Sequence, residues 1–258
     1  MAKTQDGPQK RRIVVKKFAV FDIDGTVFRW QLFSEVVFEL INDGYIPGAA
    51  KKSIDIKMDE WRSRQHAHSF HDYEVAIIEA FFPYVKNLPV AAIEAAAETV
   101  IARAGTHVYM YTRDLIARLK KEGYTLIAIS GSQDEIVQKF AHLWHFDIAI
   151  GQIHDSENNL YTGTIPGNKL LVLQKGEILK DIVKKHGLDW QESIGVGDSR
   201  SDIPLLKLVE NPIAFNPNDE LFNAAKEHGW KVVIERKNMI YELEPQNGTY
   251  LLASANTR

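Results

Sequence analysis

The chain has 258 residues, which at roughly 150 residues per domain allows one large domain or two modest ones. Hydrophobic residues make up 45% and charged residues 25% of the sequence, as in ordinary globular proteins, which excludes a disordered or coiled-coil chain. The net charge of -3 lacks the basic excess of nucleic-acid-binding proteins, and the absence of cysteine excludes a disulfide framework or a thiol nucleophile.

The N-terminal segment is more basic than the remainder of the chain. Its first residues, MAKTQDGPQKRR, contain no apolar stretch of signal-peptide length. We interpret residues 1–16 as a basic, solvated tail, although such a cluster would also suit anionic lipid or RNA. Apolar runs elsewhere fall short of the roughly 18 residues needed to span a bilayer. The sequence therefore predicts a cytoplasmic protein that binds neither nucleic acid nor a membrane.

Short apolar runs alternate with segments of helical periodicity along most of the chain. The first run begins at Phe18 and ends in the turn-forming pair Asp24-Gly25. Further buried strands are expected at residues 125–129, 193–196, 212–215 and 231–234, and helices at residues 114–121, 134–144, 177–186 and 220–228. This alternation predicts an α/β fold with a Rossmann-like parallel sheet, whose ligands bind beyond the carboxyl ends of the strands.

Two segments depart from the alternation. Residues 33–106 give helices without an intervening strand, at residues 34–42, 54–64, 73–82 and 90–104. We interpret this segment as an inserted all-helical domain, and residues 17–32 and 107–258 as the α/β core. Residues 148–165 have the pattern of a β-hairpin that turns at Asn158-Asn159.

The segment FDIDGT places Asp22 and Asp24 two residues apart, where a buried strand opens into a turn. Two carboxylates about 4 Å apart repel by roughly 4 kcal/mol at an effective dielectric constant near 20, so such a pair needs a cation or a shared proton. The alternative interpretation makes both residues ordinary turn and cap residues.

A second acidic pair, Asp198 and Asp202 in GDSRSD, follows another predicted buried strand. In a parallel sheet both pairs lie at the same edge, and convergent carboxylates without cysteine favour Mg²⁺. The alternative is that these two residues only cap a helix ahead of Pro204.

Two further segments offer groups that suit a phosphate. ISGS, at the end of the predicted strand 125–129, supplies the Ser130 hydroxyl group and the Gly131 amide. Lys175 precedes the predicted helix 177–186, where a cation is unfavourable unless an anion lies nearby. A solvated lysine is the alternative interpretation.

FDIDGT, ISGS, Lys175 and GDSRSD, in this order, resemble the motifs of the haloacid dehalogenase superfamily of aspartate-nucleophile phosphohydrolases. The resemblance covers the chain from about Phe18 to Phe215, and the helical insertion looks like that superfamily's C1-type cap. The stretches NNLYTGTIPG, ISGSQDEIV and AFNPNDEL resemble its phosphoserine-phosphatase-like branch.

The resemblance implies a role for each motif. Asp22 would be the nucleophile that forms an aspartyl-phosphate, and Asp24 the general acid and base. The Asp22 side chain, the Asp24 backbone carbonyl group and Asp198 would bind Mg²⁺, with Asp202 in support. The phosphoryl oxygens would be held by Ser130, the Gly131 amide and Lys175. An acid two residues after the nucleophile suits phosphate esters rather than dehalogenation, because only an ester has an alkoxide to protonate.

The residues of the predicted cap do not identify the substrate. Enzymes of this branch that act on phosphoserine place a glutamate nine residues after the nucleophile, where this sequence has Gln31, although Glu35 lies one helical turn further on. Arg29, Arg62 and Arg64 would suit a carboxylate or second phosphate, or are solvated. Of these cap residues we name Gln31 and Arg62 as candidate substrate ligands.

Histidines and aromatic residues also gather in the predicted cap. The histidines His66, His68 and His71 lack a fourth metal ligand and are expected at the surface. Six aromatic residues would line a pocket or pack the helices: Trp30, Phe33, Trp61, Phe70, Phe81 and Phe82.

The sequence therefore predicts a Mg²⁺-dependent phosphomonoesterase that hydrolyses a small phosphorylated metabolite. A phosphotransferase or mutase of the same superfamily is one alternative, and a phosphoaspartate signalling module is another. The specific substrate and the oligomeric state do not follow from the sequence.

Overall fold

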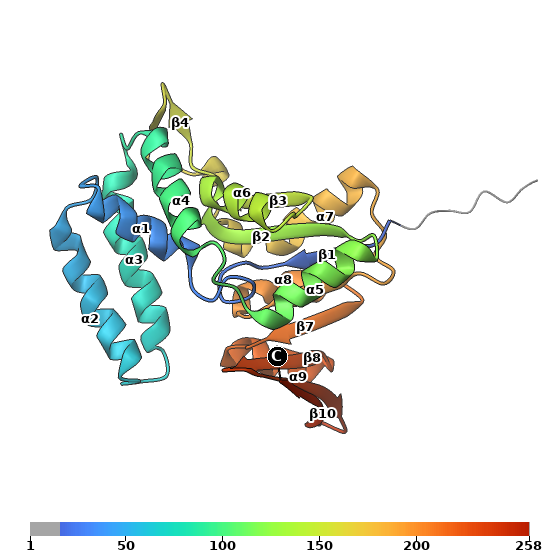
Figure 1. Ribbon diagram of the computed structural model, residues 1–258. Helices are drawn as coiled ribbons and strands as arrows, with labels where there is room; N and C mark the ends of the chain where they lie inside the picture. Colours follow the sequence, from blue (N-terminus) through green and yellow to red (C-terminus); the bar gives the residue numbers. More distant parts are fainter. Residues whose placement is uncertain (1–15, 258) are drawn as a thin grey trace, which may run out of the picture.

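An eight-stranded sheet forms the centre of the protein, whose computed structural model describes residues 16–257 (Figure 1). Its strand order is β10-β9-β8-β7-β6-β1-β2-β3. The strands are β1 (Phe18–Phe21), β2 (Thr125–Gln133), β3 (Ile148–Gln152), β6 (Ile194–Gly197), β7 (Asn211–Phe215), β8 (Lys231–Arg236), β9 (Met239–Gln246) and β10 (Thr249–Thr257). In the part of the sheet that runs β8-β7-β6-β1-β2-β3, all neighbouring strands pair in parallel. The basic tail predicted for residues 1–16 lies, except for Lys16, outside the described residues.

Strand β1 lies in the middle of the sheet and is buried on both sides, as its continuous apolar run predicts. Phe21, its last residue, is in register with Ala128 of β2 and Val196 of β6. Because these three strands are parallel, the residues that follow them emerge at one edge of the sheet. This edge carries the predicted catalytic motifs.

Helices cover both faces of the sheet, which confirms the predicted α/β fold. Ala19 and Phe21 of β1 share a hydrophobic cluster with helices α5 (Met110–Lys121) and α6 (Asp134–Leu143). Phe18 and Val20 point to the opposite face, which is covered by three further helices. These are α7 (Lys175–His186), α8 (Ile203–Leu206) and α9 (Asp219–His228).

Four helices lie between β1 and α5 in the sequence, at the left of Figure 1. They are α1 (Leu32–Asn42), α2 (Lys51–Arg62), α3 (Ser69–Val85) and α4 (Val90–Ala104). The helical content predicted for residues 33–106 is thus present, and no strand interrupts it. Its apolar residues belong to the same cluster as one face of the sheet, so a separate domain stays a prediction. Among the described residues, no helix has the length and apolarity that a bilayer-spanning helix requires.

The prediction of one hairpin over residues 148–165 is wrong in its first half. Residues 148–152 form β3, which pairs in parallel with β2 after the α6 crossover. The hairpin itself is smaller, with arms β4 (Ser156–Glu157) and β5 (Leu160–Tyr161). Its turn does fall at Asn158-Asn159, both in the left-handed region that asparagine tolerates. The hairpin packs on the connection between α3 and α4, where the Val90 amide donates to the Asn159 carbonyl group.

A second hairpin, formed by β9 and β10, extends the sheet with antiparallel strands and was not predicted. The sequence carries its signal, since Asn247 and Gly248 both have positive φ angles, as two-residue hairpin turns require. Alternation between apolar and polar residues is weak in β10, where most side chains are exposed, which explains why periodicity alone did not identify it.

Candidate active site

Three carboxylates from two distant segments meet at the edge of the sheet. Asp22 follows β1, and its amide donates to the carbonyl group of Val196 in β6 at 3.0 Å. Asp198 follows β6 directly, and Asp202 lies one turn later. One carboxylate oxygen from each of Asp22, Asp198 and Asp202 lies within 4.8 Å of the others. The structure thus brings Asp22 of the first acidic pair together with both residues of the second.

Lys175, the first residue of α7, is buried between two of these carboxylates and is only 2% exposed. Its Nζ donates to Asp22 Oδ1 at 2.7 Å and to Asp202 Oδ1 at 2.6 Å. Burial opposes its charge, but Asp202 and Asp22 outweigh burial and raise the pKa of Lys175. The anion that a lysine at this helix end requires is therefore supplied by the protein itself.

Asp202 is fully buried, and both of its carboxylate oxygens are hydrogen-bonded. Its Oδ2 accepts hydrogen bonds from the amides of Asp198 at 3.0 Å and Ser199 at 3.1 Å. It closes a capping box with Ser199, while its Oδ1 binds Lys175. Asp202 therefore fixes both the lysine and the backbone that presents Asp198.

Asp24 lies in a network of hydrogen-bond donors. Its Oδ1 accepts from the Leu32 amide at 2.5 Å, and its Oδ2 accepts from the hydroxyl groups of Ser130 at 2.8 Å and Ser132 at 2.7 Å. Burial raises the pKa of Asp24, and the hydrogen bonds from Leu32, Ser132 and Ser130 only partly oppose this. A carboxyl group with a raised pKa holds a proton more readily, as a general acid must.

Ser132 was missed by sequence analysis. It follows Ser130 by two residues on strand β2, so both side chains point to the same side of the strand, a signal available in the ISGS motif. Ser132 also accepts a hydrogen bond from the Phe33 amide at 2.9 Å. It lines a cavity together with Asp22, Asp24 and Asp198, whereas Ser130 is fully buried and does not line it.

Burial raises the pKa of Asp22 to about 7 despite Lys175, because Asp202 and Asp24 add further negative charge. Burial, Asp22 and Asp202 likewise raise the pKa of Asp198. Within residues 16–257, the four carboxylates Asp22, Asp24, Asp198 and Asp202 form ion pairs with one basic side chain, Lys175, which contacts Asp22 and Asp202. The site is therefore short of positive charge, and its donors are the oxygen atoms that Mg²⁺ prefers.

Gly25 makes room for the Asp198 carboxylate. Its φ angle is +79°, and a Cβ atom added there would lie 2.1 Å from Asp198 Oδ2. We expect Gly25→Ala to displace Asp198 and to weaken Mg²⁺ binding at least about 10-fold, in addition to backbone strain of about 1–3 kcal/mol. Calorimetric titration with Mg²⁺ measures the affinity.

Gly123→Ala is the matched control for Gly25→Ala. Gly123 has a φ angle of +80°, but nothing lies within 4 Å of an added Cβ atom. This variant carries similar strain and should bind Mg²⁺ like the unaltered protein. Equal affinities in the two variants would show that contact between Gly25 and Asp198 does not shape the metal site.

A cavity of about 600 Å³ extends from the carboxylates to the helical segment. Asp22, Asp24, Asp198, Lys175 and Gly131 lie at its base. Its other walls include Arg29, Trp30, Gln31, Phe33, Trp61, Phe70, Glu74, Ile78 and Tyr109. Of the two predicted substrate ligands, the structure brings Gln31 to this cavity. It does not bring Arg62, which lies exposed at the end of α2.

Glu74 of α3 is a further carboxylate in the cavity wall that sequence analysis missed. Gln31 Nε2 donates to Glu74 Oε1 at 2.6 Å, so the uncharged residue at position 31 holds a charged one beside it. Burial raises the pKa of Glu74, although the hydrogen bond from Gln31 opposes this. The sequence signal was a stripe of residues four apart on one helix face, namely Phe70, Glu74 and Ile78.

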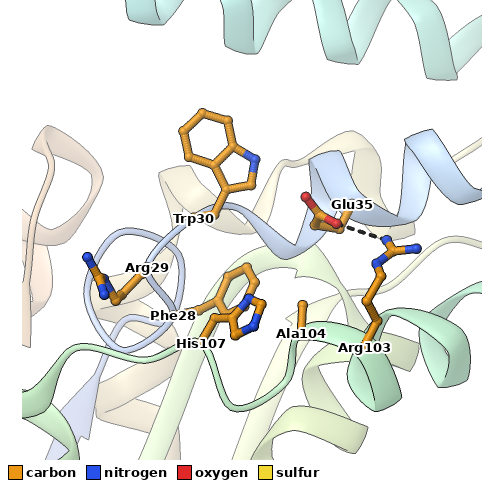
Figure 2. A pocket seen from close by; sticks show the side chains of 7 residues that line it. All are labelled: Phe28, Arg29, Trp30, Glu35, Arg103, Ala104 and His107. Atoms are coloured by element: carbon orange, nitrogen blue, oxygen red, sulfur yellow. Dashed lines mark hydrogen bonds and ion pairs between the residues drawn. The ribbon is translucent and has the colours of Figure 1, made fainter.

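A second hollow, of about 460 Å³, is lined in part by the segment that leads from β1 into the helices. Figure 2 shows its lining, with Arg103 of α4 paired with Glu35 of α1 at 2.9 Å. Arg29 and Trp30 line both this hollow and the central cavity. Glu35, the other acidic residue near position 31, therefore lines the second hollow and not the central cavity, and it is paired with Arg103.

The chain matches the family model for haloacid dehalogenase-like hydrolases over residues 19–207, which include all four motifs. It belongs to this family. The phosphoserine phosphatase of Methanocaldococcus jannaschii is 26% identical over 200 residues, covering 78% of this chain and 85% of that one. The histidinol-phosphatase of Neisseria meningitidis is 26% identical over 223 residues, covering 85% of this chain and 99% of that one.

Solved structures agree with this placement of the hydrolase. A Bordetella pertussis protein of unknown function superimposes with a TM-score of 0.67 at 19% identity, covering 86% of this chain and 99% of that one. A phospho-aspartyl intermediate analogue of phosphoserine phosphatase gives 0.59 at 23% identity, covering 86% and 95%. At these identities the likeness concerns the fold. Together with the family match and the relatives, it confirms the predicted superfamily, its phosphoserine-phosphatase-like branch and the enzyme class of phosphatase.

Proposed function

We propose that this haloacid dehalogenase-like hydrolase is a Mg²⁺-dependent phosphomonoesterase that acts on a small phosphorylated metabolite through an aspartyl-phosphate on Asp22. The convergence of Asp22, Asp198 and Asp202 beside buried Lys175 carries this proposal. A nucleophile, a cation for the phosphoryl oxygens and an acid, Asp24, thus share one cavity, as phosphoryl transfer requires.

The residues at the base of the cavity fit Mg²⁺. Asp22 and Asp198 would hold it, together with the Asp24 backbone carbonyl group, and Asp202 would fix Asp198 through the backbone. When bound, Mg²⁺ neutralises charge on the phosphoryl group and the carboxylates. Because four carboxylates lie beside a single lysine, the added positive charge of Mg²⁺ would be favourable at this site.

The covalent steps use two carboxylates of the chain. Asp22 attacks phosphorus, so that a bond from its carboxylate oxygen to phosphorus forms and the ester P–O bond breaks. The Asp24 proton passes to the leaving alkoxide. Water then attacks phosphorus, Asp24 accepts its proton, and cleavage of the aspartyl P–O bond releases phosphate and restores Asp22. The donors around Asp24 orient it for both proton transfers.

Phosphate binding is assigned to Lys175 and the Gly131 amide, both at the cavity. Ser130 stays predicted as a phosphate ligand, while its hydroxyl group also positions Asp24 at 2.8 Å. Ser132, at the cavity wall and bonded to the same Asp24 oxygen, joins the positioning residues.

Hydrolysis and transfer to an acceptor alcohol share the first step and differ in the second. A phosphotransferase or mutase would form a new phosphate ester when alcohols are added, whereas the proposed hydrolase releases inorganic phosphate at the same rate. Product analysis with a panel of phosphorylated amino acids, sugars and alcohols separates the two. A signalling module would be labelled by acetyl phosphate without continued turnover.

Removal of divalent metal is expected to abolish phosphate release from every ester in this panel. Mg²⁺ should restore it, because the chain alone does not neutralise the charge that develops at the phosphoryl group. Ca²⁺ should restore little, since it prefers six to eight oxygen ligands in a looser geometry. Full turnover in EDTA would contradict the proposal that Mg²⁺ takes part.

A further inference from the structure

Glu74 is the carboxylate of the cavity that the proposed mechanism does not use. It lies on α3, between Phe70 and Ile78, and these three residues form one stripe facing the cavity. The proposed chemistry takes place at the carboxyl ends of the strands, whereas Glu74 belongs to the opposite wall. A charged residue in this wall would face the part of the substrate that is not phosphate.

The contacts of Glu74 orient it without neutralising it. Gln31 Nε2 donates to Glu74 Oε1 at 2.6 Å, and Ser34 in turn donates to Gln31 Oε1 at 3.0 Å, which fixes the amide. His71 Nδ1, 3.9 Å from Glu74 Oε2, belongs to a side chain that is 72% exposed. Within residues 16–257, no lysine or arginine forms an ion pair with Glu74.

Aromatic rings from helices α2 and α3 and from the loop before α1 surround this part of the cavity. The ring centroids of Trp30 and Trp61 lie 5.1 Å apart, and those of Trp61 and Phe70 lie 5.2 Å apart. All three rings are half-buried and line the cavity. The ring of Tyr73 joins this cluster, with its centroid 5.7 Å from that of Trp30. Aromatic rings attract cations through their negative faces, and more strongly where water is excluded.

We propose that Glu74, held by Gln31, and the aromatic wall of Trp30, Trp61 and Phe70 bind a cationic amine of the substrate. This inference rests on the proposed phosphatase function and assigns it a substrate class, the phosphate monoesters of amino alcohols. The phosphate group lies at Lys175 and the ammonium group at Glu74. Gln31 itself is uncharged, and the negative charge beside it is supplied by Glu74 of α3.

The cavity can hold both charged ends of such a substrate. Glu74 and Lys175 line the same cavity of about 600 Å³. An ammonium group at Glu74 gains a counter-charge there. A neutral substituent of the same size gains the contact with the rings but leaves Glu74 without a counter-charge.

The test compares two esters that differ in one group. O-phosphoethanolamine carries an ammonium group where propyl phosphate has a methyl group. We expect Glu74→Gln to lower the ratio of their kcat/KM values at least about 10-fold, mainly through the KM of the amine. The ratio comes from one preparation, so a loss of folded protein cancels. Glu74→Asp keeps the charge and should retain part of the preference.

Glu79→Gln is the control, because Glu79 lies on the same helix but is exposed and does not line the cavity. It should leave the ratio unchanged. If both esters are hydrolysed and Glu74→Gln leaves the ratio as it was, the amine site is overturned while the phosphatase function stands. If no ester releases phosphate in a reaction that depends on Asp22, the proposed function falls and the amine site with it.

Discussion

Asp22→Asn is expected to lower the rate of phosphate release by about 10⁴-fold or more, because a carboxamide does not supply the nucleophilic oxygen. The substitution keeps the size of the side chain, and its amide oxygen still accepts the hydrogen bond that Lys175 Nζ makes to Asp22 Oδ1 at 2.7 Å. The fold should therefore persist. A phosphate-release assay with an aryl phosphate measures the loss, and circular dichroism checks the fold.

The matched control for Asp22→Asn is Asp181→Asn, which removes an exposed carboxylate of α7. It makes the same change in charge and should keep the full rate. Unaltered turnover in Asp22→Asn would mean that another group attacks phosphorus, and the aspartyl-phosphate mechanism would have to be abandoned.

Lys175→Met is expected to lower both stability and activity. The lysine is 2% exposed and bonds to Asp22 and Asp202, of which Asp202 is fully buried. Removing it leaves two buried carboxylates without their cation, which costs about 3–5 kcal/mol of the free energy of unfolding. The lost contact with the phosphoryl oxygens should also reduce kcat/KM by about 10²–10³-fold. Urea denaturation in EDTA measures the first effect, because bound metal would partly replace the lysine.

Lys180→Met removes a cation from the same helix as a control. Lys180 is half exposed and pairs with Glu177 three residues earlier, a contact worth a few tenths of a kcal/mol. Its stability and activity should stay close to those of the unaltered protein. A Lys175→Met protein as stable as this control would show that Lys175 does not neutralise the buried carboxylates.

The central fold was predictable because its signals are local. The buried run at Phe18 and the alternation of strands and helices follow from hydrophobic periodicity, and they specify a parallel sheet. The β3 strand was misassigned, since a short apolar run before a turn suits either a hairpin arm or a parallel strand. Which of the two forms depends on the strand it pairs with. A partner strand that is distant in the sequence leaves no signal in a local pattern.

The candidate site was predictable where motifs carried it and not where packing did. Asp22, Asp24 and Asp198 follow strands, so parallel topology alone brings them to one edge. Glu74 belongs to a helix whose approach to Gln31 depends on how α1 and α3 pack, which the sequence does not show. Arg62 was expected near the substrate but lies at the exposed end of α2. The position of α2 also depends on how the helices pack, which the sequence does not show.

The most direct test is a crystal structure with Mg²⁺ and a phosphoryl mimic such as beryllium fluoride. We predict one metal ion bound by Asp22 and Asp198, with the mimic attached to the Asp22 carboxylate and in contact with Lys175. A metal bound elsewhere, or a mimic that does not reach Asp22, would contradict the account.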